Sequence, residues 1–402
     1  MRKTTRMGFH SGMKISRLFP TSLILLILLL PLANFATPAA SGKYLFFVGT
    51  YTEPATGSKG IYSYRYDAST HEITPLGLAA ETTNPSWVAL SPNGQFLFAV
   101  NELGNYKGPN SGGVSAFSVD HSTGKLTFLN EVGSRGADPC YVTVDKTGKW
   151  VLVANYTGGS VAVFPVTEDG KLGEASSFVQ HTGHGTDPKR QEAPHAHSIN
   201  LSPDNRFAYV DDLGLDQVLV YKFDAAKGTL TPNDPPYAKI EGGSGPRHFA
   251  LRADAKFAYV VSEMKGTVTV LANDTHAGSL RPIQTVSTLP AGFKGNIEDA
   301  EIEIHPSGKF LYASNRGDGN SIAIFAIDAA KGTLTPIDIT STQGKTPRNF
   351  AIDPSGTLLL AENMESNNIV VFRIDQNTGK LTPTGKVLEI SQPVCVKFLA
   401  VE

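Results

Sequence analysis

A sequence pattern that recurs about every 52 residues constrains the fold of this chain more than any other feature. Each repeat holds an apolar segment, a tight turn and a second apolar segment, as in residues 87–101 (WVALSPNGQFLFAVN) and 301–315 (EIEIHPSGKFLYASN). A further β-rich stretch follows, such as NIVVFRI at 368–374, and a turn of the Gly-Lys-Leu type then leads into a fourth strand. Four short strands in a repeat of this length are typical of one blade of a β-propeller.

The number of repeats predicts the number of blades. The first turn recurs at spacings of 48 to 57 residues, at Gly42, Gly94, Gly148, Asn205, Ala255, Gly308 and Gly356. Residues 44–48 match a second strand without its first strand, and residues 393–400 match a first strand without its turn. Joining these two segments completes a seventh blade and leaves no open sheet edge. We therefore predict that residues 41–402 form a single all-β domain, a seven-bladed β-propeller of four-stranded antiparallel blades, with the ring closed by the C-terminal strand joining the N-terminal blade.

Residues 1–40 differ from the repeats and are typical of a secretory signal peptide with its cleavage region. Five Lys and Arg residues precede position 18, no acidic residue occurs before Glu53, and the apolar run LILLILLLPL (23–32) leads into the small-residue segment ATPAA (36–40). The apolar run is shorter than the roughly 20 residues of a membrane span, although an uncleaved anchor stays an alternative. Translation from Met13 instead of Met1 would leave a signal of more usual length. We expect an exported protein, periplasmic or secreted, without stable membrane insertion after the signal is removed.

The charge balance and the missing motifs limit the kinds of partner. With 35 basic and 37 acidic residues, the formal net charge of −2 gives no reason to expect binding to nucleic acid or to an anionic membrane surface. The sequence contains no phosphate-binding P-loop, no dinucleotide Gly-x-Gly-x-x-Gly after a strand and no Gly-x-Ser-x-Gly nucleophile turn. Our interpretation is a monomer that uses no cofactor and whose partner is a small molecule.

Strand direction predicts which polar residues meet. Because the strands of a blade alternate in direction, the start of each first strand and the end of each second strand lie on the same rim of the ring. This rim carries titratable side chains that differ between blades, whereas the opposite rim carries repetitive turns. We predict catalytic roles for His197, Arg247, Glu263 and Arg316, and substrate binding by His195, His248, Asp212, Asn155 and Arg348. For Asp212, a role as a loop brace fits equally well.

The residue types indicate the chemistry of this rim. A guanidinium group offers paired donors that suit a carboxylate or phosphate, so Arg247 and Arg316 fit an anionic substrate, with an internal salt bridge to Glu263 as the alternative. His195 and His197 lie two residues apart on one face of a strand, a spacing that suits a metal ion. A general base or a substrate hydrogen bond fits the two imidazoles better, and we predict no metal site.

Several motifs together resemble the seven-bladed β-propeller lactonase family. They are YLFFVGTYT (44–52), ANYTGGSV (154–161), PHAH (194–197), DLGLD (212–216), GPRH (245–248) and ASNRG (313–317). The resemblance extends over essentially the whole of residues 41–402. Members of this family include bacterial propeller-type 6-phosphogluconolactonases and fungal carboxymuconate lactonizing enzymes.

The resemblance implies hydrolysis of a sugar lactone to the open hydroxy acid. It places the family's site on His197, with His195 as an alternative, and on Arg247, Glu263 and Arg316. Glu263 or His197 would activate water, and the two arginines would hold an anionic group and the oxyanion. A muconate-type lactonizing or cycloisomerase enzyme and a non-catalytic exported binding propeller are the alternatives. The expected export leaves open whether the lactone is phosphorylated.

Overall fold

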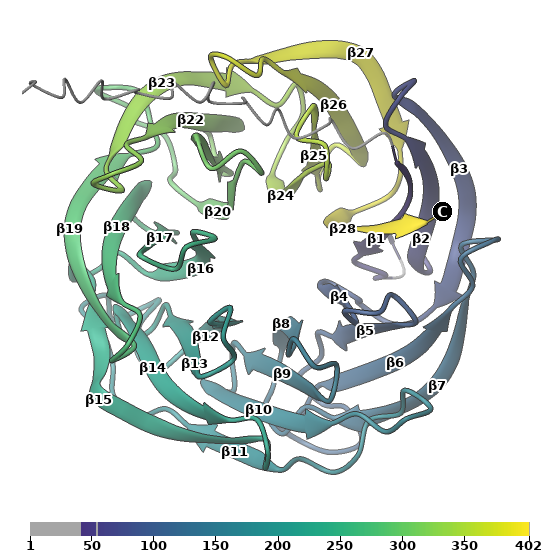
Figure 1. The fold of residues 1–402 in the computed structure, drawn as a ribbon, viewed down its shortest axis with the longest axis vertical. Coiled ribbons are helices and arrows are strands. Elements are labelled where there is room, and N and C mark those ends of the chain that lie inside the picture. Colours follow the sequence, from purple (N-terminus) through teal and green to yellow (C-terminus); the bar gives the residue numbers. More distant parts are fainter. Residues whose placement is uncertain (1–41, 54, 402) are drawn as a thin grey trace, which may run out of the picture. The chain divides into compact units, whose positions relative to one another are not determined.

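Seven antiparallel sheets of four strands each form a ring in the computed structural model, which describes residues 42–53 and 55–401 (Figure 1). One strand of each sheet faces the axis of the ring and the remaining three follow it outward (Figure 1). Every neighbouring pair within a sheet is antiparallel, as in β8–β9 and β9–β10. The predicted all-β, seven-bladed propeller is confirmed.

The blades take their strands in chain order. Blade 1 combines the C-terminal strand β28 (Pro393–Val401) with β1 (Lys43–Thr50), β2 (Gly60–Asp67) and β3 (Glu72–Glu81). Blades 2 and 3 consist of β4 (Val88–Leu90), β5 (Phe96–Asn101), β6 (Gly113–Val119) and β7 (Leu126–Gly133), and of β8 (Pro139–Val144), β9 (Trp150–Asn155), β10 (Ser160–Pro165) and β11 (Ser177–Gln180). Blades 4 and 5 consist of β12 (Ala196–Leu201), β13 (Phe207–Asp212), β14 (Gln217–Asp224) and β15 (Thr229–Lys239), and of β16 (Pro246–Leu251), β17 (Phe257–Ser262), β18 (Thr267–Asp274) and β19 (Ser279–Ser287). Blades 6 and 7 consist of β20 (Asp299–Ile304), β21 (Phe310–Asn315), β22 (Ser321–Ile327) and β23 (Leu334–Ser341), and of β24 (Pro347–Ile352), β25 (Leu358–Asn363), β26 (Asn368–Ile374) and β27 (Leu381–Glu389).

Strand β28 closes the ring as the sequence predicts. It pairs with β1 along the whole length of that strand, from Lys43 opposite Val401 to Thr50 opposite Pro393. The two ends of the repeat region therefore share one sheet. The predicted signal peptide at residues 1–40 lies outside the described residues. Among the residues that are described, no helix has the length and apolar character needed to cross a membrane.

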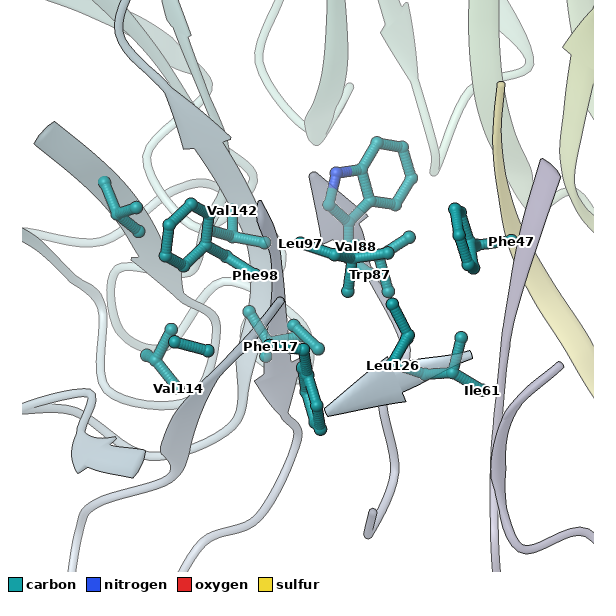
Figure 2. Packing of buried hydrophobic residues seen from close by; sticks show 14 of the residues in the cluster. Phe47, Ile61, Trp87, Val88, Leu97, Phe98, Val114, Phe117, Leu126 and Val142 are labelled. Atoms are coloured by element: carbon teal, nitrogen blue, oxygen red, sulfur yellow. The ribbon is translucent and has the colours of Figure 1, made fainter. Parts of the chain in front are cut away.

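Apolar side chains between neighbouring blades form the core. The second strands β5 and β13 are buried over nearly their whole length, because both of their faces pack against other blades. Figure 2 shows one cluster, in which Phe47 of β1 and Val142 of β8 join Leu97, Phe98 and Phe117 of blade 2. Full burial of one such side chain contributes roughly 1.5–3 kcal/mol. The contacts between blades thus stabilise a ring that no single blade could form alone.

The turns between first and second strands occur where the sequence predicts them. The backbone has a positive φ at six of the seven predicted turn positions, for example 69° at Gly94 and 71° at Gly308. Asn205 and Ala255 adopt the same conformation, with φ of 67° and 56°. Asparagine tolerates it, whereas alanine loses about 1–2 kcal/mol there because its Cβ approaches the backbone.

Candidate active site

Six of the seven inner strands carry a β-bulge close to their first residue, and in four of these the pairing passes over a Cys, His or Arg residue. Pairing with the second strand passes over Cys140 in β8, His197 in β12, Arg247 in β16 and Arg348 in β24. A bulge re-aims the side chain of the unpaired residue. Here all four side chains line the cavities at one end of the ring.

A pocket of about 280 Å³ lies at this end of the ring. Its wall consists of bulge residues, of residues that directly follow a second strand and of two loop residues: Tyr51, Glu102, Cys140, Tyr156, Arg190, His197, Glu263, Glu298, Arg316 and Arg348. A small space of about 10 Å³ adjoins it and is lined by Arg247 and His248, among others. Pockets for drug-sized ligands begin near 300 Å³, so this one suits a single small polar molecule.

A larger hollow lies elsewhere on the propeller and differs in chemistry. It measures about 540 Å³ and lies between the outer strands of blades 5 and 6. Apolar residues such as Val286, Leu289 and Phe293 dominate its wall, and Lys265 and Asp338 are the charged residues in it. It has no convergent set of titratable side chains, so we assign the candidate site to the smaller, charged pocket.

Glu263 lies at the centre of the charged pocket. Its Oε2 accepts hydrogen bonds from Arg247 Nε (2.9 Å) and Arg316 Nη2 (2.8 Å), and its Oε1 accepts one from Arg190 Nη2 (2.5 Å). Burial alone would raise the pKa of Glu263, but the attraction of Arg316, Arg247 and Arg190 lowers it to about 2. The carboxylate is therefore ionised, and its three arginine partners make it a weak base.

Arg247 is a buried support of this network. Its side chain is 1% exposed, and its Nη1 donates to the Ala300 carbonyl oxygen (2.7 Å) and lies 3.3 Å from His248 Nε2. Burial, followed by repulsion from Arg316, lowers the pKa of Arg247 to about 10. His248 Nδ1 in turn lies 3.1 Å from Glu301 Oε2. The pKa of His248 lies well below its usual value because of burial and Arg247, so its neutral ring donates to Glu301 and accepts from Arg247.

His197 presents an imidazole to the pocket. Its ring is buried, with Nδ1 3.7 Å from the Cys140 sulfur and its centroid 5.4 Å from that of Tyr156. Burial, and then the positive charge of Arg247, lower the pKa of His197 well below its usual value. The imidazole is therefore neutral near pH 7 and has a lone pair that can accept a proton.

Arg348 lines the pocket beside Tyr51 and Glu102. Its guanidinium carbon lies 5.4 Å from the centre of the Tyr51 ring, and its Nη2 lies 3.8 Å from Glu102 Oε2. The Tyr51 hydroxyl donates to the same Glu102 oxygen at 2.9 Å. The salt-bridge distance is too long for a hydrogen bond, so Arg348 is more loosely paired than the arginines around Glu263.

The structure brings six of the nine predicted site residues together. His197, Glu263, Arg316 and Arg348 line the pocket, and Arg247 and His248 line the adjoining space. The other three are His195, Asp212 and Asn155, which brace loops next to the pocket. Asp212 accepts hydrogen bonds from the His195 backbone and from His181 Nδ1 (2.6 Å). The amide of Asn155 donates to the Ser134 carbonyl oxygen at 3.1 Å.

Six pocket residues are absent from the predicted set. Tyr51, Glu102 and Tyr156 directly follow a second strand, as Glu263 and Arg316 do, and this shared position is a signal in the sequence. Arg190 and Glu298 lie on loops that precede inner strands, and Cys140 is a bulge residue. Cys140 directly follows the first-strand proline Pro139, as Arg247 and Arg348 follow theirs, and this shared position is also a signal in the sequence. No periodic feature of the sequence identifies the loop residues Arg190 and Glu298.

Within residues 42–53 and 55–401, no three His, Cys, Asp or Glu side chains are arranged to hold a metal ion. The His195 ring stacks on the Tyr156 ring, with a centroid distance of 4.6 Å, and the His197 ring lies edge-on to the Tyr156 ring at 5.4 Å. His195 Nδ1 is 3.1 Å from the Tyr156 carbonyl oxygen. Tyr156 is thus a neighbour that both histidines share, and His197 also contacts Cys140 and the ring of His248.

The fold and the pocket define a seven-bladed β-propeller with an arginine-rich site at one end of the ring. The model of the family "Lactonase, 7-bladed beta-propeller" matches residues 45–398. The chain belongs to this lactonase family, as the resemblance in its motifs predicts.

Three relatives are similar over nearly the whole repeat region. The chain is 39% identical over 357 residues to the 6-phosphogluconolactonase of Bacillus subtilis, covering 89% of this chain and 99% of that protein. It is 37% identical over 337 residues to the 6-phosphogluconolactonase of Formosa agariphila, covering 83% and 94%. The solved structure of PpgL, a periplasmic gluconolactonase of Pseudomonas aeruginosa, has a TM-score of 0.83 at 35% identity and covers 90% of this chain and 100% of that one.

Proposed function

We propose that this protein hydrolyses a sugar lactone to the open hydroxy acid. The observation that carries the proposal is the meeting of a neutral imidazole, His197, with Arg316 and Arg348 in one pocket of about 280 Å³. Relatives named 6-phosphogluconolactonase and gluconolactonase support the reaction class. An imidazole can accept a proton from water, and guanidinium groups can stabilise the negative charge on the attacked carbonyl oxygen.

In the proposed reaction, water adds to the carbonyl carbon of the lactone while His197 accepts one of its protons. The carbonyl oxygen becomes an oxyanion, which Arg316 and Arg348 stabilise. When the oxyanion collapses, the bond between the carbonyl carbon and the ring oxygen breaks. The imidazolium of His197 then returns its proton to the ring oxygen, which becomes the hydroxyl group of the product. The enzyme regains its starting protonation state.

We assign Glu263 a positioning role in place of a role as the base. Its two oxygens already accept three arginine hydrogen bonds, whereas no ion pair within the described residues engages the imidazole of His197. Glu263 instead fixes Arg316 in the wall of the pocket. Arg247 supports Glu263 from the adjoining space and uses its own Nη1 on the Ala300 carbonyl oxygen.

We further infer that the protein acts outside the cytoplasm, and its monomeric state stays a prediction. The composition of residues 1–40 supports export, and so does the similarity to PpgL, which is named a periplasmic gluconolactonase. That the protein binds no nucleic acid, cofactor or metal ion stays a prediction from the sequence. N-terminal sequencing of the protein from its native envelope or medium tests the export and the cleavage near residue 40.

The purified mature protein tests the activity. Acid release from δ-gluconolactone and from its 6-phosphate is measured above the spontaneous rate, with a muconolactone as the third substrate. Turnover of either gluconolactone supports the proposal, and turnover of the muconolactone alone would replace it by the lactonizing alternative. A His197→Ala variant with unchanged turnover would show that the assigned base is incorrect.

A further inference from the structure

Arg190 is held differently from the other arginines of the site. Arg247 and Arg316 are buried and come from a strand or from the residue that follows one. Arg190 comes from the loop between β11 and β12, and 42% of its side chain is exposed. Arg190 is therefore the arginine that a molecule approaching the pocket contacts first.

The loop itself is fixed by the neighbouring residue, Gln191, which is 1% exposed. Gln191 Nε2 donates to the Leu213 carbonyl oxygen and to Asp216 Oδ1, both at 2.8 Å. Its Oε1 accepts the backbone N–H groups of Thr186 and Asp187, both at 3.0 Å. These four hydrogen bonds hold the backbone beside Arg190, so the freedom that remains belongs to the Arg190 side chain.

Only one of the three guanidinium nitrogens of Arg190 donates hydrogen bonds to the described residues. Nη2 donates to Glu263 Oε1 at 2.5 Å and to the Tyr156 hydroxyl at 3.3 Å, whereas Nε and Nη1 have no hydrogen-bond partner within the described part of the chain. Glu263 keeps its bonds to Arg247 and Arg316 through Oε2 when Arg190 turns away. Arg190 can therefore change partners without leaving the central carboxylate unpaired.

We propose that Arg190 selects lactones that carry an anionic substituent such as a phosphate, by offering its free donors to that group at the mouth of the pocket. This inference rests on the proposed lactonase function. A guanidinium group forms paired, charge-assisted hydrogen bonds with a phosphate or carboxylate. Tyr156 and Glu263 hold the side chain at the mouth until the substrate arrives.

Steady-state kinetics of wild type and Arg190→Ala on δ-gluconolactone and its 6-phosphate test this role. We expect KM for the 6-phosphate to rise about 10- to 100-fold in the variant, with kcat within about threefold, because one charge-assisted pair is lost. KM for the uncharged lactone should change by less than about threefold. Arg190→Lys keeps the charge without the paired donors and should give an intermediate KM. Inorganic phosphate should inhibit the wild type competitively and the Arg190→Ala variant much less.

Lys189→Ala is the matched control, because Lys189 is an exposed residue of the same loop outside the pocket wall. It should leave both KM values within about twofold. Equal KM changes for the two lactones in Arg190→Ala, or a wild type that does not prefer the 6-phosphate, would overturn the role of Arg190 while leaving the lactonase function intact. A wild type inactive on both lactones would instead overturn the proposed function. Circular dichroism of each variant establishes that it is folded.

Discussion

Three carboxyl groups and one lysine from neighbouring blades, two of them buried and two partly buried, form a cluster whose titration should control stability. Glu301 and Glu303 lie on β20, Glu362 on β25 and Lys397 on β28. Burial raises the pKa values of Glu301 and Glu303 to about 7 against the opposing effect of Lys397. Glu362 is fully buried, and neither of its carboxyl oxygens has a hydrogen-bond partner within the described residues. Burial, then repulsion from Glu303 and Glu301, raises its pKa well above 4.5.

The sign of the effect follows from proton linkage. A carboxyl group with a raised pKa in the folded state binds more protons there than in the unfolded chain. Its contribution to stability is therefore greatest below pH 4.5 and is lost as the pH rises. The loss is about 1.4 kcal/mol per pH unit, so at pH 7.0 it reaches at most about 3.4 kcal/mol for one group.

Glu362→Gln removes this titration and nearly keeps the shape of the side chain. We expect the free energy of unfolding of the variant, relative to wild type, to increase by about 2–3 kcal/mol between pH 4.5 and pH 7.0. Urea unfolding of both proteins at several pH values in this range measures the difference. Any constant cost of burying the amide cancels in that comparison, and so does the titration of His197 and His248, which both proteins share.

Two further variants make the test specific. Lys397→Met removes the cation that faces the three carboxyl groups, so it should destabilise the protein more at pH 7.0 than at pH 4.5. Glu389→Gln alters an exposed carboxyl at the end of β27 and should show no pH-dependent difference from wild type. A Glu362→Gln effect that stays constant within about 0.5 kcal/mol over this pH range would refute the reasoning, because a titrating group must produce a slope.

Three predictions concern the pocket. Glu263→Gln should lower the free energy of unfolding, measured in urea at pH 7, by about 3–5 kcal/mol, because the buried Arg247 loses its counter-charge. It should also lower kcat/KM, because Arg316 loses the partner that fixes it. Unchanged stability would contradict the ion network. His197→Asn should reduce kcat about 10²- to 10⁴-fold, which is the range typical of losing a general base, and should change the midpoint of urea unfolding little. A kcat within threefold of wild type would exclude the role of general base. Since burial and Arg247 lower the pKa of His197, kcat/KM should stay level as the pH falls from 7.5 to 6.5, and a tenfold decrease in a pH profile would show that the imidazole is charged there.

The architecture could be predicted because every blade repeats the same pattern of apolar strands and turn residues. Turn residues such as Gly94 and Gly308 recur at nearly constant spacing, and the incomplete repeats at the two ends complement one another. The rim that would hold the site also follows from strand direction alone. Neither result depends on side-chain detail, so both could be obtained without the structure.

The members of the site were harder to predict, because local geometry decides them. Arg247 and His248 are adjacent in sequence, and regular alternation would turn their side chains to opposite faces of the strand. The bulge at Arg247 changes that alternation and lets both side chains border the same small space. Arg190 reaches Glu263 across 73 residues from a loop that the blade repeat does not specify. Its position depends on the hydrogen bonds of Gln191, which no pattern in the chain indicates.

At the end of the second strand, one residue has a structural role and the next residue lines the pocket. The last residue of the second strand is an asparagine in four blades, and its side-chain amide donates to the carbonyl oxygen of a preceding loop residue in each case: Asn101 to Thr83, Asn155 to Ser134, Asn315 to Thr288 and Asn363 to Thr342. In three of these four blades the next residue lines the pocket, and it is a different residue each time: Glu102, Tyr156 and Arg316. Because the brace is made one residue earlier, the wall residue can change its charge or size without disturbing the contact between blades. This explains why Asn155 resembles a site residue in the sequence while Tyr156 is the one in the wall, and how one ring can present a different functional group from each blade.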